Sequence, residues 1–169
     1  MIKAAARKAY AMADGTRQPP YSSYAAIMAT FAGGLAAAGV VARLLDRDPQ
    51  CHTALDFFVL SAASFKASRT LSHDEVTSFL RDPFVRGKAH TGEDEEPVAG
   101  GMEQAIGELV TCSRCAGTWV AAGLAATQIL APRFGRLLTW SLGAAAANDF
   151  LQAGFSALTA KTNQLEQES

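Results

Sequence analysis

Two cysteines separated by two residues are the clearest candidates for chemistry in this chain. Cys112 and Cys115 have the spacing that zinc sites and thiol–disulfide motifs use. The uncharged stretch 115–132 follows, and a helix that begins near Thr111 would place the first thiol at its N-terminus, where the helix dipole lowers a thiol pKa. Three interpretations are open: a metal site, a redox pair, and two small side chains that pack the start of a helix.

A metal site would need further ligands, because structural zinc takes four. On one continuous helix Glu108 would share a face with both cysteines. His73 could also complete the set, and a second chain could supply two more thiolates. Zinc and iron are the candidate metals. The candidate ligands are Cys112, Cys115, Glu108 and His90.

Long uncharged stretches predict that the chain is an integral membrane protein. Residues 18–42 and 115–132 carry no charged side chain, and about 20 apolar residues suffice to cross ~30 Å of hydrocarbon. The apolar segments near residues 54–70 and 137–160 are less clear, because the first is short and the second has two polar residues near its centre. These two could instead be buried or interfacial helices, which would leave two or three spans. The predicted fold is an all-α bundle of about four transmembrane helices, near residues 21–43, 54–70, 111–132 and 137–160, in a single membrane domain 21–160 between tails 1–20 and 161–169.

The distribution of Lys and Arg predicts the orientation. The N-terminal tail carries four of the 15 basic residues and the segment 66–114 carries six, whereas the two other connections carry two each. Because cytoplasmic loops are enriched in Lys and Arg, we expect both termini and this segment in the cytoplasm. The net charge of −1 and the lack of a dense basic face argue against nucleic-acid binding.

The connection between the second and third predicted helices, residues 71–110, is expected to form a cytoplasmic loop. Ser72 and Glu75 have the spacing of a capping box, which predicts a short amphipathic helix that runs to Arg81, before an Asp-Pro pair. Such a helix suits a bilayer surface. The polar stretch 87–101 is expected to be mobile. The residues expected to face a partner are Glu75, Phe79, Arg81 and Phe84.

Charged residues within the predicted membrane helices form a second group. At ~1.5 Å per residue, Lys66 lies ~17 Å along its helix and Asp149 lies ~18 Å along another helix that runs in the same direction. Arg69 lies one turn beyond Lys66. Charges at such depth normally pair or line a polar path. We therefore expect an interhelical salt bridge, with an ion or proton pathway as the functional alternative.

Three strings in the sequence resemble the DUF1360 family of small bacterial membrane proteins: KASR, DEVTSFLRDPF and GELVTCSRCAGTW. The resemblance covers roughly residues 55–160. Members typically have a proline or an aromatic residue between the cysteines and an aliphatic residue after them, whereas this chain has Ser113, Arg114 and Ala116. The resemblance implies a multi-pass protein of the bacterial cytoplasmic membrane. It implies no activity, although some members are described as sporulation-associated.

The sequence contains no catalytic motif and no glycine-rich phosphate loop. We therefore expect a non-enzymatic scaffold or accessory subunit that lies in the lipid bilayer and presents a cytoplasmic face to a protein partner. Small residues at four-residue intervals also suit packing against a second copy. One alternative is a small channel or transport component lined by Lys66, Arg69 and Asp149. The other is a metal- or thiol-dependent sensor built on Cys112 and Cys115.

Overall fold

The computed structural model describes residues 19–47, 53–87 and 95–168, and these residues are helical apart from two short strands. The strands β1 (Val85–Arg86) and β2 (Glu96–Pro97) pair antiparallel. The all-α prediction is confirmed at this level. The helices are α2 (Tyr21–Leu44), α3 (Ala54–His73), α4 (Ser78–Arg81), α5 (Gly101–Thr111), α6 (Ser113–Leu130) and α7 (Pro132–Glu168), with 3-10 turns η1 (Glu75–Thr77) and η2 (Asp82–Phe84).

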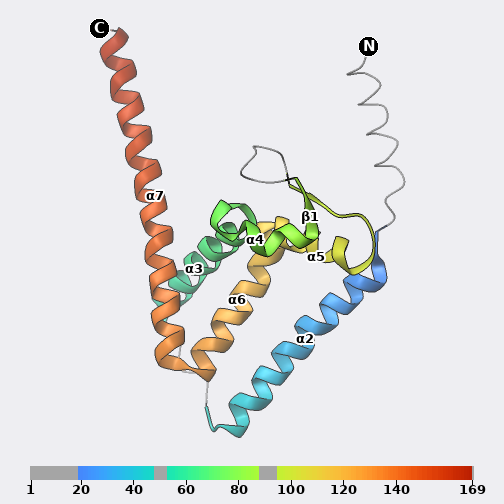
Figure 1. Ribbon diagram of the computed structural model, residues 1–169. Coiled ribbons are helices and arrows are strands. Elements are labelled where there is room, and N and C mark those ends of the chain that lie inside the picture. Colours follow the sequence, from blue (N-terminus) through green and yellow to red (C-terminus); the bar gives the residue numbers. More distant parts are fainter. Residues whose placement is uncertain (1–18, 48–52, 88–94, 169) are drawn as a thin grey trace, which may run out of the picture.

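The long helices run up and down, and the short elements gather at one end of them (Figure 1). Helix α3 makes the most extensive contacts, with α6 and α7, which also contact each other. Helix α2 packs less closely, against α5 and α6. The start of α2 and the far end of α7 lie at the same end as α4, β1 and α5 (Figure 1). We call the short elements together, residues 74–87 and 95–111, the cap.

Small side chains let the bundle helices approach closely. Ala63, Ser64 and Ser68 of α3 are buried, and Ser64 and Ser68 lie on one face because they are four residues apart. A Cβ placed on Gly117 of α6 would lie 3.6 Å from the Ser68 hydroxyl. A Cβ placed on Gly143 of α7 would lie 3.0 Å from a side-chain carbon of α3. This small-residue packing is typical of helices that associate in a membrane.

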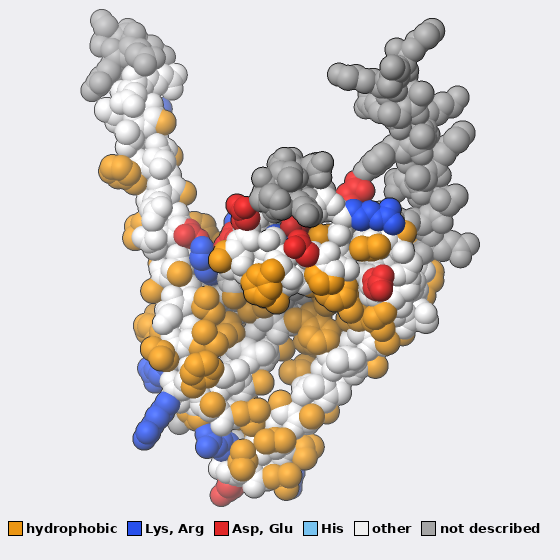
Figure 2. Space-filling model, viewed as in Figure 1, with side chains coloured by type: hydrophobic (Ala, Val, Ile, Leu, Met, Phe, Trp, Pro, Cys, Tyr) orange, Lys and Arg blue, Asp and Glu red, His pale blue; other side chains and the backbone are white. Residues whose placement is uncertain are grey.

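Large apolar side chains lie mostly outside this bundle. The largest fully buried side chains are those of Arg81 and Thr139, which are polar. By contrast, Phe57, Phe58 and Leu137 are all more than half exposed. On the face shown in Figure 2, apolar side chains cover much of the surface between two charged ends. The structure therefore has small and polar groups inside and large apolar groups outside, the reverse of the usual order in a water-soluble protein.

By length and composition, α2 is a candidate membrane span within the described ranges. The pair α5 and α6 would be a second candidate if both helices cross as one span, although an 84° bend separates them. Helices α3 and α7 are not among these candidates. One or two candidate spans give weak support for membrane association and leave the predicted four-span bundle as a proposal.

The capping box predicted at Ser72 and Glu75 is wrong. Helix α3 continues through Ser72 to His73, and the Ser72 hydroxyl is buried without a hydrogen-bond partner in the described part of the chain. The structure has a capping box at the other end of α3. There, Thr53 Oγ1 accepts a hydrogen bond from the Asp56 backbone N–H at 3.2 Å, and Asp56 Oδ2 accepts one from the Thr53 N–H at 3.0 Å. Instead of the predicted helix from Ser72 to Arg81, the chain forms η1 followed by the single turn α4.

The predicted loop and the last two predicted helices also differ from the structure. Residues 101–110, expected in the loop, form most of α5, whose N-cap Gly100 and first residue Gly101 both have positive φ. Part of the stretch expected to be mobile, residues 88–94, lies outside the described residues. Helix α7 begins at Pro132 instead of residue 137, because proline suits the first turn of a helix. The predicted C-terminal tail is helical through Glu168.

The close contact of α5 with the η2 and β2 segments of the cap gives a stability prediction. A Cβ on Gly107 would collide with the Phe84 carbonyl oxygen and lie 3.1 Å from the Pro97 Cβ. We expect Gly107→Ala to lower the free energy of unfolding by about 1–3 kcal/mol, because backbone there has no space to move. Gly123→Ala on α6 is the control, since a Cβ there meets nothing within 4 Å. Thermal unfolding in detergent measures both; equal melting temperatures for the two variants would contradict the expected collision.

Candidate functional site

The two cysteines lie at the sharp bend between α5 and α6. Cys112 is the N-cap residue of α6, and its Sγ accepts a hydrogen bond from the Cys115 backbone N–H at 3.3 Å. Cys112 is half-buried and Cys115 is exposed. The helix therefore begins one residue after Cys112, so the thiol caps the helix N-terminus.

The position of Cys112 favours its thiolate. A hydrogen bond with the Cys115 side chain and another with the Cys115 backbone N–H lower the pKa of the Cys112 thiol below its ordinary value. Both bonds stabilise a negative charge on sulfur. Because the thiolate is the nucleophile, Cys112 is the more reactive position for thiol chemistry in this pair.

The described residues do not assemble a metal-ligand set. Within these ranges, no group of three or more His, Cys, Asp or Glu side chains is placed to hold a metal ion. His73 lies at the C-terminal end of α3, and His90 lies outside the described residues. The shared helix face predicted for Glu108 and the cysteines is wrong, because the bend at Cys112 separates α5 from α6. A zinc or iron site would therefore need ligands from a second chain or from undescribed residues.

Glu108 instead faces α2. The Tyr24 hydroxyl donates a hydrogen bond to Glu108 Oε2, and Gln104 Nε2 donates one to Glu108 Oε1 at 2.9 Å. Gln104 is itself held by the backbone N–H of Gly100, which donates to its Oε1 at 3.0 Å. The sequence analysis did not identify Tyr24 or Gln104. The four-residue spacing of Gln104 and Glu108 was a usable signal, whereas nothing in the sequence links Glu108 to a tyrosine 84 positions away.

A cavity of ≈ 450 Å³ lies between α2, α5 and α6. Its lining is mostly apolar, with the Glu108 carboxylate among the few polar groups. The Phe31 ring meets the Trp119 ring edge-on, with 5.0 Å between centroids, and both rings line the cavity. The remaining lining residues are Tyr24, Ile27, Met28, Ala105, Leu109, Cys115 and Thr118. Cys115 and Glu108 thus share a cavity although they do not share a helix.

The structure brings together two of the three charged residues expected within the membrane helices. Lys66 Nζ lies 2.7 Å from Asp149 Oδ2, which links α3 to α7. Their side chains are 25% and 46% exposed. Arg69 is exposed and forms no ion pair with the described part of the chain. Whether the Lys66–Asp149 pair lies inside a bilayer stays a prediction.

Arg81 is buried, which corrects the expectation that it faces a partner. Its side chain is 1% exposed, and its Nε lies 2.7 Å from Glu95 Oε2. A second nitrogen donates to Glu95 Oε1 at 3.1 Å, so the ion pair is bidentate. Of the other residues expected to face a partner, Glu75 and Phe79 are exposed and Phe84 is half-buried.

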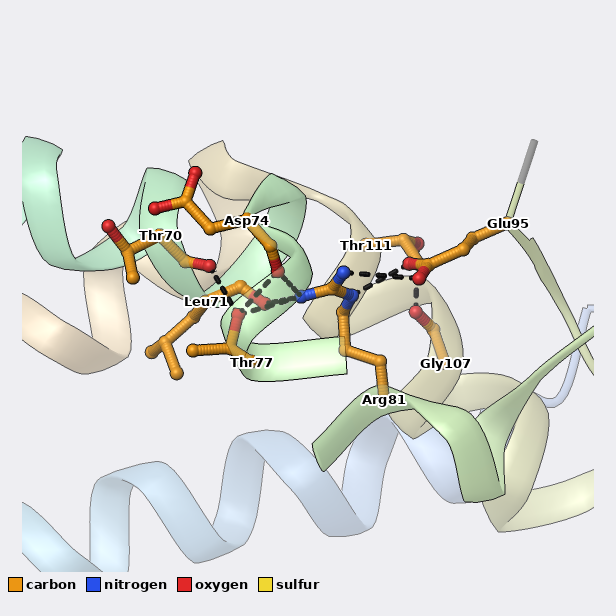
Figure 3. A network of polar contacts seen from close by, with 8 residues as sticks. All are labelled: Thr70, Leu71, Asp74, Thr77, Arg81, Glu95, Gly107 and Thr111. Atoms are coloured by element: carbon orange, nitrogen blue, oxygen red, sulfur yellow. Dashed lines mark hydrogen bonds and ion pairs between the residues drawn. The ribbon is translucent and has the colours of Figure 1, made fainter. Parts of the chain in front are cut away.

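The Arg81 guanidinium also holds the end of α3 (Figure 3). Its NH1 donates hydrogen bonds to the Leu71 carbonyl at 2.7 Å, to the Asp74 carbonyl at 3.1 Å and to Thr77 Oγ1 at 2.9 Å. A cation at a helix C-terminus also compensates the negative end of the helix dipole. One side chain therefore joins the end of α3, the η1 turn and the segment that leads to β2.

Comparisons with known proteins agree on the region that contains these features. Residues 59–155 match the model of a family described as "Protein of unknown function (DUF1360)". The chain is also similar to the UPF0713 protein YngL of Bacillus subtilis (strain 168), with 28% identity over 104 residues, which cover 58% of this chain and 76% of the relative. No solved structure matches the chain.

The buried ion pair gives a second prediction. Arg81→Met would leave Glu95 charged and poorly solvated, so we expect a loss of about 3–5 kcal/mol in the free energy of unfolding. Arg81→Met combined with Glu95→Gln should recover part of this loss, but not all, because the hydrogen bonds from Arg81 to the Leu71 carbonyl and to Thr77 Oγ1 stay lost. Arg86→Met, at an exposed position on β1, is the matched control. Chemical unfolding in detergent measures all four proteins; a loss no larger than that of Arg86→Met would contradict the role of Arg81.

The thiols give a third prediction, on pH dependence. The third cysteine, Cys51, is first replaced in a Cys51→Ala background. Because the pKa of Cys112 is lowered, we expect the alkylation rate of Cys112 to reach half of its maximum at a pH below that typical of a free thiol. Cys115→Ala removes the main stabilising hydrogen bond, so it should move this midpoint to higher pH. Mass spectrometry of the alkylated Cys112 peptide gives the rate at each pH. An unchanged midpoint in the Cys115→Ala variant would show that the side-chain bond does not stabilise the thiolate.

Proposed function

The chain belongs to the DUF1360 family, and from its structure we propose a non-enzymatic membrane protein that crosses the bilayer four times and presents its cap to a protein partner. The observation that supports this most strongly is the inverted distribution of side chains. Ala63 and Ala146 are fully buried, whereas Phe57, Phe58 and Leu137 are 65%, 68% and 67% exposed. Hydrocarbon tails would cover these large apolar side chains without cost, and water would not.

The proposed topology places both chain ends and the cap in the cytoplasm. The start of α2, the end of α7 and the cap lie at one end of the bundle (Figure 1). The two connections at the other end are poor in Lys and Arg, as external loops are. Helix α7, with 37 residues, is longer than a bilayer crossing needs. Its last turns would extend into the cytoplasm beyond the cap.

The Lys66–Asp149 pair supports crossing by α3 and α7. Each helix carries a charge that would oppose insertion alone by ~2.5–3.5 kcal/mol. Contact at 2.7 Å lets the two charges neutralise each other. The same contact favours a structural role over the alternative of a channel, because neither charge is left to bind an ion along a polar path. Arg69 is near enough to the cytoplasmic end of α3 to extend toward the interface.

The cap has the properties of a docking surface. The Arg81–Glu95 ion pair and the carbonyl contacts of Arg81 fix its backbone. This rigid segment exposes Val76 by 75% and Phe79 by 66%, next to the acidic Glu75. A preformed surface binds with a smaller loss of conformational entropy than a mobile loop does. The proposed partner is therefore a protein that covers this apolar and acidic face.

A thiol-dependent sensor is the second candidate, and the position of Cys112 favours it. Its Sγ caps α6 and accepts the Cys115 N–H, and its pKa is lowered. Oxidation or metal binding at this point would act on the bend between α5 and α6. Since α5 belongs to the cap, such a change would reach the proposed docking surface.

Photo-crosslinking in native membranes tests the scaffold proposal. A photoreactive amino acid at Phe79 should give one discrete adduct with a partner protein, in an amount that follows expression of the chain. The matched control is the same amino acid at Phe58, which is similarly exposed at 68% but lies on the proposed lipid-facing side of α3. We expect lipid adducts alone at Phe58. Lipid adducts alone at both positions, or the same protein adduct at both, would contradict a specific docking face on the cap.

A further inference from the structure

We infer that the cavity between α2, α5 and α6 binds an amphiphile that has a hydrocarbon tail and a primary ammonium head. The cavity volume of ≈ 450 Å³ lies within the range of small-ligand sites. Its lining gives three properties that together define the ligand: a carboxylate, an apolar channel, and a fixed direction from one to the other.

The carboxylate of Glu108 is held in place but carries no counter-ion. Tyr24 and Gln104 each donate a hydrogen bond to one of its oxygens. No Lys or Arg side chain in the described ranges forms an ion pair with it. Each carboxylate oxygen has a second acceptor position. A cationic donor in the cavity would fill it and neutralise the charge.

The apolar part of the cavity follows α2. Its lining runs from Tyr24 to Phe31, about 10 Å along the helix. Ile27 and Met28 lie between these two, and Trp119 of α6 lies against Phe31. The start of α2 lies beside the cap (Figure 1), so the polar end of the cavity, at Tyr24, is nearer the cap than the aromatic end, at Phe31. This direction matches an amphiphile with its head toward the cap.

The loose packing of α2 gives such a ligand a way in. Helix α2 makes far less contact with α6 than α3 does, and Gly33, Gly34 and Gly39 of α2 have nothing within 4 Å of a built Cβ. With the proposed topology, the opening between α2 and α6 would face the bilayer, and the head would lie at its cytoplasmic surface. This orientation rests on the proposed function, whereas the match between cavity and ligand does not.

Tryptophan quenching tests the site, because Trp119 lines the cavity and the chain has only one other tryptophan. A Trp140→Phe variant in nanodiscs reports on Trp119 alone. The probes are lipids with brominated tails, which quench tryptophan on contact. Phosphatidylethanolamine has a primary ammonium that donates hydrogen bonds, and phosphatidylcholine has a quaternary ammonium that does not.

We expect half-maximal quenching of Trp119 at about tenfold less phosphatidylethanolamine than phosphatidylcholine, which is the usual size of one hydrogen bond to a charged group. Glu108→Gln should remove the preference, and Glu103→Gln, at an exposed position on the same helix, should keep it. Equal quenching by the two lipids would overturn phosphatidylethanolamine as the ligand. A preference for phosphatidylcholine would also overturn it, because it would indicate cation–π binding of a quaternary ammonium.

Two further measurements are needed. One tests membrane contact independently of the cavity, and the other tests whether the amine comes from a lipid or from a soluble amphiphile. A Trp119→Phe variant reports on Trp140 of α7; quenching there without any preference supports membrane contact whatever Trp119 does. A brominated long-chain amine added to protein in detergent tests a free amine. If this amine quenches Trp119 only when Glu108 is present, and the two lipids in nanodiscs quench it equally, the ligand is a soluble amine. If neither the free amine nor phosphatidylethanolamine shows a response that depends on Glu108, the site is overturned.

Discussion

Small side chains on one face of α3 permit the contact on which the other helices depend. Ser64 and Ser68 turn toward the bundle, and Gly117 and Gly143 allow α6 and α7 to lie directly against α3. The serine hydroxyls donate to carbonyls of their own helix, at 2.7 and 3.0 Å, so their burial leaves no unpaired donor. Such packing depends on van der Waals contact and close backbone approach, because little large apolar surface is buried. It therefore suits a lipid bilayer, in which hydrocarbon tails cover the apolar outer surface of the bundle.

The position of the cap depends on the position of α3. Arg81 bonds to carbonyls at the end of α3 and to Glu95, so the position of the cap follows the position of α3. Helix α5 then leads into α6 through the bend at Cys112. The bend also brings Glu108 toward Tyr24 and opens the cavity beside α2. The thiol pair, the cavity and the exposed face at Phe79 consequently belong to one connected element.

The sequence predicted the parts of the structure that depend on composition and spacing along one helix. Helices α2 and α3 begin at the expected residues, and counting depth along two helices was enough to pair Lys66 with Asp149. Helix α5 was missed although Met102, Ala105, Ile106 and Leu109 have helical spacing, because the polar stretch 87–101, which ends in two glycines, resembles a loop. The burial of Arg81 could not be predicted, since its partner Glu95 stands in an acidic run with no mark that distinguishes it. The bend at Cys112 could not be predicted either, because no proline or glycine stands there.

Labelling of single cysteines by a membrane-impermeant maleimide tests most directly whether the bundle crosses the bilayer with its cap inside. In a background without Cys51, Cys112 and Cys115, the three test positions are Arg47→Cys beyond α2, Leu35→Cys within α2, and Glu75→Cys on the cap. We expect Arg47→Cys to react in intact cells, Glu75→Cys to react only after the membrane is opened, and Leu35→Cys, 45% exposed, to react in neither case until detergent is added. Reaction of Glu75→Cys in intact cells would contradict the topology, and reaction of Leu35→Cys as fast as Glu75→Cys in opened membranes would contradict the membrane placement itself.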